Sequence, residues 1–85
     1  MKNIRVCVIG RKTKDFIAEI NSIRKIEGIK VLKRRNKPFY DIAGELNTDD
    51  DFNLLCKHLH YLIMNCEAEL EIEDKDLQNE IVKNI

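Results

Sequence analysis

Hydrophobic and polar residues alternate with two different periods along this chain, and each period predicts one type of secondary structure. Four short segments, residues 4–9, 29–35, 39–46 and 68–73, either alternate with the two-residue period of a β-strand or are apolar on both sides. Three other segments repeat apolar residues every three or four positions, which is typical of amphipathic helices. The pattern therefore predicts strands and helices that follow one another along the chain.

The helical segments carry end signals as well as apolar stripes. Thr13 and Thr48 are predicted N-caps, and Gly28 is predicted to end the first helix. The first stripe comprises Phe16, Ile17, Ile20, Ile23 and Ile26. The second comprises Phe52, Leu55, Leu59, Leu62, Ile63 and Cys66, after an acidic first turn formed by Asp49, Asp50 and Asp51. A short terminal helix is predicted over residues 74–85, with Leu77, Ile81 and Ile85 on one side.

The strand segments differ in how many of their sides are apolar. Residues 4–9 are apolar on both sides, which predicts a central strand. In residues 39–46, the alternation predicts Tyr40, Ile42 and Leu46 on one face and Phe39 and Ala43 on the other. Residues 36–38 are predicted to form the turn before this strand, and Gly44 to mark a bulge or a close backbone contact.

The order strand-helix-strand-strand-helix-strand, followed by a helix, predicts an α+β fold. Two crossover units joined by a hairpin make the ferredoxin-like βαββαβ sandwich. Right-handed crossovers then give an antiparallel sheet with strand order 4-1-3-2 and both long helices on one face. At 85 residues, the chain is expected to form one such domain over residues 1–85.

Composition excludes some classes of protein, and the distribution of charge raises the question of where the charged residues lie in the fold. No apolar run approaches the ~18 residues of a membrane span, and Val6 to Ile9 is too short for the core of a signal peptide. Three widely spaced cysteines predict neither a disulfide framework nor a zinc site and favour the reducing cytoplasm. The net charge is zero, yet residues 1–37 hold twelve of the fifteen Lys and Arg, and residues 38–85 hold twelve of the fifteen Asp and Glu.

On the predicted fold, this charge separation becomes a separation across one sheet. Cys7, Ile9, Phe39 and Ala43 are expected on the face away from the helices, where a partner would cover them. Strand 4 is expected to show Glu67, Glu69, Glu71 and Glu73 at one edge of that face, and strand 2 and its turn carry the bases at the other. A homo-oligomer that lays an acidic edge near a partner's basic edge is therefore predicted.

Candidate chemistry is sparse in this sequence. The loop Gly10, Arg11, Lys12 and Thr13 opens a helix and is a weak candidate for an anion site. It lacks the nucleotide-binding patterns, and it resembles the phosphoryl loop of acylphosphatases only superficially. Cys56 and His60 are four residues apart, but no third ligand lies near them in sequence, and the acidic run 49–51 is explained by helix capping. We expect no enzyme, no cofactor and no metal.

A second interpretation concerns the basic hairpin, which carries Lys30, Lys33, Arg34, Arg35 and Lys37. Bases beside the aromatic residues Phe39 and Tyr40 on such a sheet are typical of RNA-recognition modules. The first strand offers no aromatic residue to stack on, so nucleic-acid binding is kept as the alternative.

Three segments resemble the ligand-sensing (RAM) domain of Lrp/AsnC-type regulators and, more distantly, ACT domains. They are Ser22 to Val31, Tyr40 to Leu46 and Thr48 to Phe52, and the likeness covers about residues 16–63. The resemblance implies a stand-alone regulatory module that dimerises and binds an amino-acid-sized ligand at the interface, near Tyr40 and Asp41. The chain departs from the family pattern at residues 36–38, where the turn glycine before Tyr40 is replaced.

Overall fold

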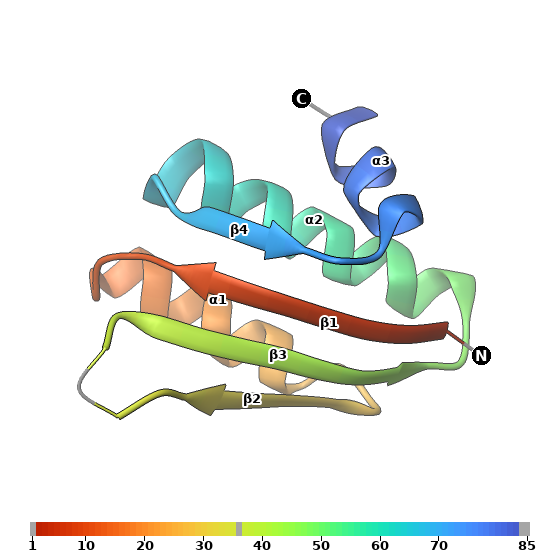
Figure 1. Ribbon diagram of the computed structural model, residues 1–85, viewed down its shortest axis with the longest axis horizontal. Helices are drawn as coiled ribbons and strands as arrows, with labels where there is room; N and C mark the ends of the chain where they lie inside the picture. The colour runs from red at the N-terminus through yellow and green to blue at the C-terminus, as the bar shows by residue number, and fades with distance from the viewer. Residues whose placement is uncertain (1, 36, 84–85) are drawn as a thin grey trace.

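The computed structural model describes residues 2–35 and 37–83 and contains a four-stranded antiparallel sheet. Its strands are β1 (Lys2–Ile9), β2 (Ile29–Lys33), β3 (Phe39–Leu46) and β4 (Glu69–Ile72). Its helices are α1 (Lys14–Arg24), α2 (Asp49–Cys66) and α3 (Lys75–Lys83). The sheet order β2-β3-β1-β4 is the predicted order 4-1-3-2 read from the other edge, so the ferredoxin-like fold is confirmed (Figure 1).

All three helices leave the same face of the sheet uncovered. In Figure 1, α1 and α2 lie behind the sheet, and α3 lies beside β4 at the upper edge. The buried residues of the strands alternate as the pattern predicted, so that Val6, Val8 and Ile42 meet the helices. The two-residue period places every other strand residue on the opposite surface, which is called the open face below.

The helix caps explain where each helix begins. The Thr13 hydroxyl accepts a hydrogen bond from the Phe16 amide at 3.2 Å, and Thr48 accepts one from the Asp51 amide at 3.1 Å. Both predicted N-caps are therefore confirmed. Asp74 caps α3 by accepting from the Asp76 amide at 2.8 Å, so that helix starts one residue later than predicted. Leu77 and Ile81 are buried against the core as predicted, whereas Ile85 lies outside the described residues.

The predicted role of Gly28 as the end of the first helix is wrong. Helix α1 ends at Arg24 with Lys25 as its C-cap, and Gly28 lies in the turn into β2 with φ of 85°. Its carbonyl accepts a hydrogen bond from the Glu45 amide at 3.2 Å. A Cβ atom built on Gly44 would lie 1.9 Å from that carbonyl oxygen. Gly44 therefore marks the predicted close backbone contact, and the pairing of β3 with both neighbours runs through it without a bulge.

Four predicted strand ends also differ from the structure. Strand β1 begins at Lys2 rather than Ile4, and β4 covers Glu69–Ile72 rather than residues 68–73. Strand β2 ends at Lys33 rather than Arg35, and Asn36 of the predicted turn lies outside the described residues. Glu67 was expected in the acidic row of β4, and this is wrong. It is the C-cap of α2 in the left-handed conformation, with φ of 53°, and the strand begins only at Glu69. Because Glu67 ends the helix, it is not part of β4, and its side chain does not follow the alternation of the strand.

Candidate functional site

The open face of the sheet is organised in rows that cross the strands. The register places Ile9 between Phe39 and Glu69, and Cys7 between Asp41 and Glu71. Ala43 is flanked by Arg5 on one side and Lys30 on the other. The predicted apolar side chains therefore lie on this face, interleaved with the charged side chains of Arg5 and Asp41.

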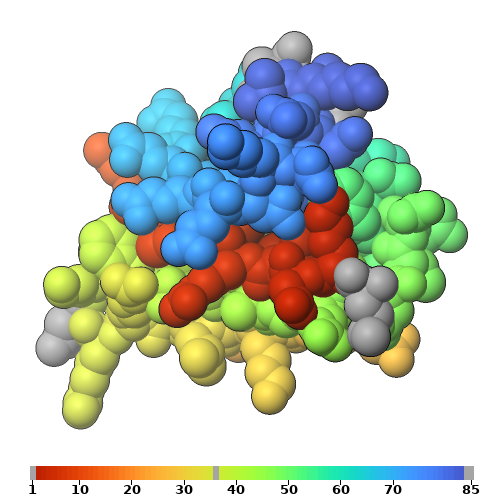
Figure 2. Space-filling view, turned by 45° about the vertical axis from the view of Figure 1, so that its right-hand side comes forward, coloured from red at the N-terminus to blue at the C-terminus, as the bar shows by residue number. Residues whose placement is uncertain are grey.

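The two edges of the open face carry opposite charges. Glu69 and Glu71 are exposed on β4, and Glu73 follows the end of that strand. On the opposite edge, β2 presents Lys30 and the exposed Leu32, and Arg34 follows. Figure 2 shows this face with the blue segment of β4 above, the red β1 in the middle and the yellow side chains of the β2 edge below. The charge separation along the sequence thus lies across a single surface.

An ion pair occupies the basic half of the open face. Arg34 donates two hydrogen bonds to the Asp41 carboxylate, from Nε at 2.8 Å and from an Nη atom at 3.1 Å. These bonds from the guanidinium lower the pKa of Asp41 below its ordinary value. The same guanidinium lies 5.7 Å from the centre of the Phe39 ring, within the range of a cation–π contact. Asp41 is therefore a charged and oriented group on this face.

Cys7 stands beside this pair on the neighbouring strand. Burial and the nearby Asp41 carboxylate raise the pKa of the Cys7 thiol. The thiol is therefore kept neutral, and it behaves as a small apolar group rather than as a nucleophile.

The predicted site pair Tyr40 and Asp41 is divided by the sheet. Tyr40 is only 3% exposed and packs in the core, with its ring centre 5.4 Å from that of Phe16. Asp41 lies on the open face, half-exposed. A ligand on the open face would therefore meet Asp41, with Cys7, Ile9, Phe39 and Ala43 around it, and would not meet the Tyr40 ring.

A wide hollow lies on the open face near the beginning of β2. It encloses about 890 Å³ and is lined by both signs of charge. Arg5 and Lys30 supply cations, and Asp41, Glu45 and Glu73 supply carboxylates. Such a mixed lining suits a small zwitterion, which needs a cation for one end and an anion for the other.

The basic hairpin does not act as one surface. Lys30 lies on the open face, and Arg34 pairs there with Asp41, whereas Lys33 and Lys37 line a second hollow at the end of the sheet. Arg35 is exposed beyond the end of β2. Arg11 and Lys12 of the predicted anion loop line the same second hollow, beside Gly10. The structure thus brings together parts of two candidate sites that the sequence kept apart.

Three residues of α2, Cys56, His58 and His60, lie in two different environments. Burial raises the pKa of the Cys56 thiol to about 11, and the neighbouring His60 lines a small hollow with it. His58 turns to α1, where its Nδ1 lies 2.6 Å from a Glu19 carboxylate oxygen. Sequence reasoning missed this pair because Glu19 is 39 residues away. Among residues 2–35 and 37–83, no group of three or more metal-ligating side chains is found.

Two further results concern the protein as a whole. Within the described part of the chain, no helix is long and apolar enough to cross a membrane. None of the protein-family models, characterised proteins or solved structures compared with this chain matches it. The resemblance to RAM and ACT domains therefore stays a prediction, and any function must be argued from the surfaces described above.

Proposed function

We propose that this chain is a small regulatory module of the cytoplasm that forms a two-fold dimer through the open face and senses an amino-acid-sized ligand there. The observation that carries the proposal is the arrangement of charge on that face. An acidic edge on β4 and a basic edge at β2 flank two central strands that present Cys7, Ile9, Phe39 and Ala43 together with polar side chains. Each edge is complementary to the other one, so the natural partner for this surface is a second copy of it.

The charges also select one orientation of the two copies. If the two-fold axis runs parallel to the strands, β4 of each copy faces β2 of its partner, and acid meets base along both edges. If the axis runs across the strands, each edge faces itself and like charges meet. The first arrangement is therefore favoured, and it corresponds to aligned packing of two sheets. In it, Glu71 lies opposite the Leu32 row and Glu73 opposite the Lys30 row of the partner.

The open face is large enough for such an interface. The molecule measures 32 × 25 Å along its two longer axes, which are the axes of the view in Figure 1. The open face is only part of this outline, because α3 extends beyond the sheet (Figure 1), so it can bury at most the ~800 Å² that each partner buries in a stable complex. The exposed Leu32, whose side chain is 69% accessible, would be covered in this arrangement.

The mixed hollow on the open face supports the ligand part of the proposal. A free amino acid carries one ammonium and one carboxylate group, and the hollow offers Arg5 and Lys30 for the carboxylate and Glu45 or Asp41 for the ammonium. Association of two copies would cover the hollow and exclude water from it, which strengthens both contacts. Ligand binding and dimerisation would then favour each other.

Paired charge reversals test the dimer and its orientation. Glu71→Lys with Glu73→Lys makes both edges of one variant basic, and Lys30→Glu with Leu32→Glu makes both edges of another acidic. In sedimentation experiments at high micromolar concentration, the unchanged protein is expected to be a dimer and each variant alone a monomer. An equimolar mixture of the two variants is expected to form a heterodimer. The control variant Lys14→Glu with Lys57→Glu, on the helical side, should remain a dimer.

Two results would contradict the interface. One is a strictly monomeric unchanged protein at high micromolar concentration, and the other is a mixture of the two variants that stays monomeric. The ligand is tested separately by NMR titration with the twenty free amino acids, in which amide shifts are expected at Arg5, Ala43 and Glu45. A dimer that responds to none of them would retain the interface and remove the sensing role.

The alternative function is nucleic-acid binding by the hairpin, and one observation favours it. Phe39 lies on the open face with Arg34 at 5.7 Å and Lys37 at 5.9 Å from its ring centre, a combination that can stack and neutralise a nucleotide. The acidic edge on the same face argues for the dimer instead. Titration with single-stranded RNA and DNA at low salt distinguishes the two, because nucleic-acid affinity should fall steeply as salt is added.

A further inference from the structure

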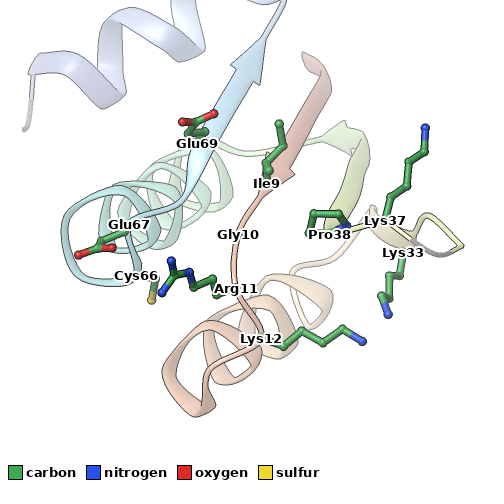
Figure 3. Close-up of a pocket in the computed structure, with 10 residues that line it drawn as sticks. All are labelled: Ile9, Gly10, Arg11, Lys12, Lys33, Lys37, Pro38, Cys66, Glu67 and Glu69. Atoms are coloured by element: carbon green, nitrogen blue, oxygen red, sulfur yellow. The ribbon is translucent and has the colours of Figure 1, made fainter.

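A second hollow lies at the end of the sheet, between the β1–α1 loop and the β2–β3 hairpin. It encloses about 700 Å³, within the range of small-molecule sites. Four cationic side chains from the two segments line it, namely Arg11, Lys12, Lys33 and Lys37. Figure 3 shows Lys12 extended from the loop toward the hairpin side of the hollow, where Lys33 lies. The two segments are more than twenty residues apart in sequence and meet only in the folded chain.

Backbone contacts hold the two segments in place. The Gly10 amide donates a hydrogen bond to the Pro38 carbonyl at 3.2 Å, which ties the loop to the hairpin. The Thr13 amide donates to the Arg11 carbonyl at 2.8 Å, and the Thr13 side chain then caps α1. The main chains of the loop and the hairpin are therefore held beside each other, and the N-terminus of α1 adds its positive end to the same region.

Two of these cations lie close to each other. The Lys12 ammonium lies close enough to Lys33 to lower the pKa of Lys33 below its ordinary value. The ion pairs formed within residues 2–35 and 37–83 use Lys2, Arg34 and His58 as their cations, and not the four cations of this hollow. An anion placed between Lys12 and Lys33 would remove this repulsion and accept hydrogen bonds from both ammonium groups.

The walls of the hollow indicate what the rest of the ligand must be. Glu67 and Glu69 lie across from the lysines, on the α2–β4 side, and they disfavour a second anionic group there (Figure 3). Ile9 and Pro38 offer apolar surface between the two sides. The anionic end of a ligand would therefore lie at the lysines, and its body would lie over these apolar side chains.

We propose that this hollow binds a phosphorylated small molecule, with its phosphate between Lys12 and Lys33 and its less polar body over Ile9 and Pro38. The lysines of this site lie outside the mixed hollow, but Ile9 and Glu69 belong to the open face as well, so a dimer would cover part of the apolar wall. The site takes a different ligand chemistry, a phosphate anion instead of a zwitterion. A regulatory module with both sites would respond to two kinds of metabolite.

The proposal is tested by NMR titration at low salt with inorganic phosphate, pyrophosphate and adenosine monophosphate. Saturable shifts are expected at residues 10–13 and at Lys33, with the monophosphate binding more tightly than phosphate alone because its body contacts the apolar wall. Lys12→Gln with Lys33→Gln should weaken binding by about tenfold or more, since two charge-assisted contacts are lost. The control Lys25→Gln with Lys57→Gln removes the same charge elsewhere and should change the affinity by less than about twofold.

Three results would overturn this site. They are shifts that do not saturate, equal weakening by the test and control variants, and affinity for oligonucleotides that rises with their length while the monophosphate does not bind. The last result would identify nucleic acid as the partner instead. The Ala43→Arg variant, designed to block the dimer, should bind the monophosphate at least as tightly as the unchanged protein, because Ile9 is then uncovered, so failure of the dimer proposal and failure of this one can be told apart.

Discussion

The two faces of this sheet are built from alternate residues of the same strands, yet they differ in burial and in the kinds of side chain that they present. Ile42 points to the helices and is fully buried, whereas its neighbour Ala43 points to the open face and is exposed. The buried residues of the covered face are apolar because they form the core, and the open face combines apolar, acidic and basic side chains. Folding stability thus depends mainly on the covered face, and the open face is available for the contacts proposed above.

The largest expected difference between the faces is in stability. Ile42→Ala removes a fully buried side chain and leaves a cavity, so the free energy of unfolding should fall by about 2–5 kcal/mol. Leu32→Ala, on the open face, should change it by less than about 0.5 kcal/mol when measured at low protein concentration. Urea denaturation followed by circular dichroism measures both. Similar losses for the two variants would mean that the open face is not independent of the core.

A smaller loss of stability is expected from a substitution at Gly44, where β3 passes close to the turn into β2. Gly44→Ala places a Cβ atom 1.9 Å from the Gly28 carbonyl oxygen, in a backbone conformation with φ of 154°. The atoms that this Cβ would meet belong to the main chain of Gly28 and Ile29, so the two strands must move apart. We expect the free energy of unfolding to fall by about 1–3 kcal/mol. The exposed variant Ala43→Ser is the matched control and should be nearly neutral. If Gly44→Ala melts at the same temperature as this control, the close contact is not a constraint.

The smallest effect concerns the ion pair on the open face. The pKa of Asp41 is lowered in the folded state by Arg34, so its contribution is present above the pKa of the unfolded chain and is lost as pH falls through the folded value. Both side chains are partly exposed, so Asp41→Asn should cost less than about 1 kcal/mol at neutral pH. The difference from the unchanged protein should disappear at acidic pH and shrink in high salt. Glu27→Gln is the control, and a difference that persists in acid would assign the effect to packing.

Local patterns predicted most of the fold correctly. The caps Thr13 and Thr48, the full extent of β3 and the faces of its side chains all depend on residues within one helical turn or one strand. The wrong assignments, Gly28 and Glu67, lie where a helix gives way to a strand. At such a junction, a residue belongs to one element or the other according to contacts with distant backbone, as between Gly28 and Glu45.

The candidate sites were predictable only in parts. The alternation identified the side chains of the open face and the charges of its edges, because a period of two is a local property. It could not show that Arg34 would hold Asp41 across the hairpin, or that His58 would reach Glu19 on the other helix. These pairs depend on the twist of the strands and on helix packing, neither of which can be read from sequence spacing.

The sequence by itself determined the types of the elements, their order and the opposite charges of the two halves of the chain. Those properties follow from periodicity, capping and composition, which act over a few residues at a time. Only the tertiary structure decided that the two charged halves would form opposite edges of one face, and that Lys12 would lie beside Lys33. Strand order and loop contacts bring together residues far apart along the chain, and electrostatic interactions depend on distance in space.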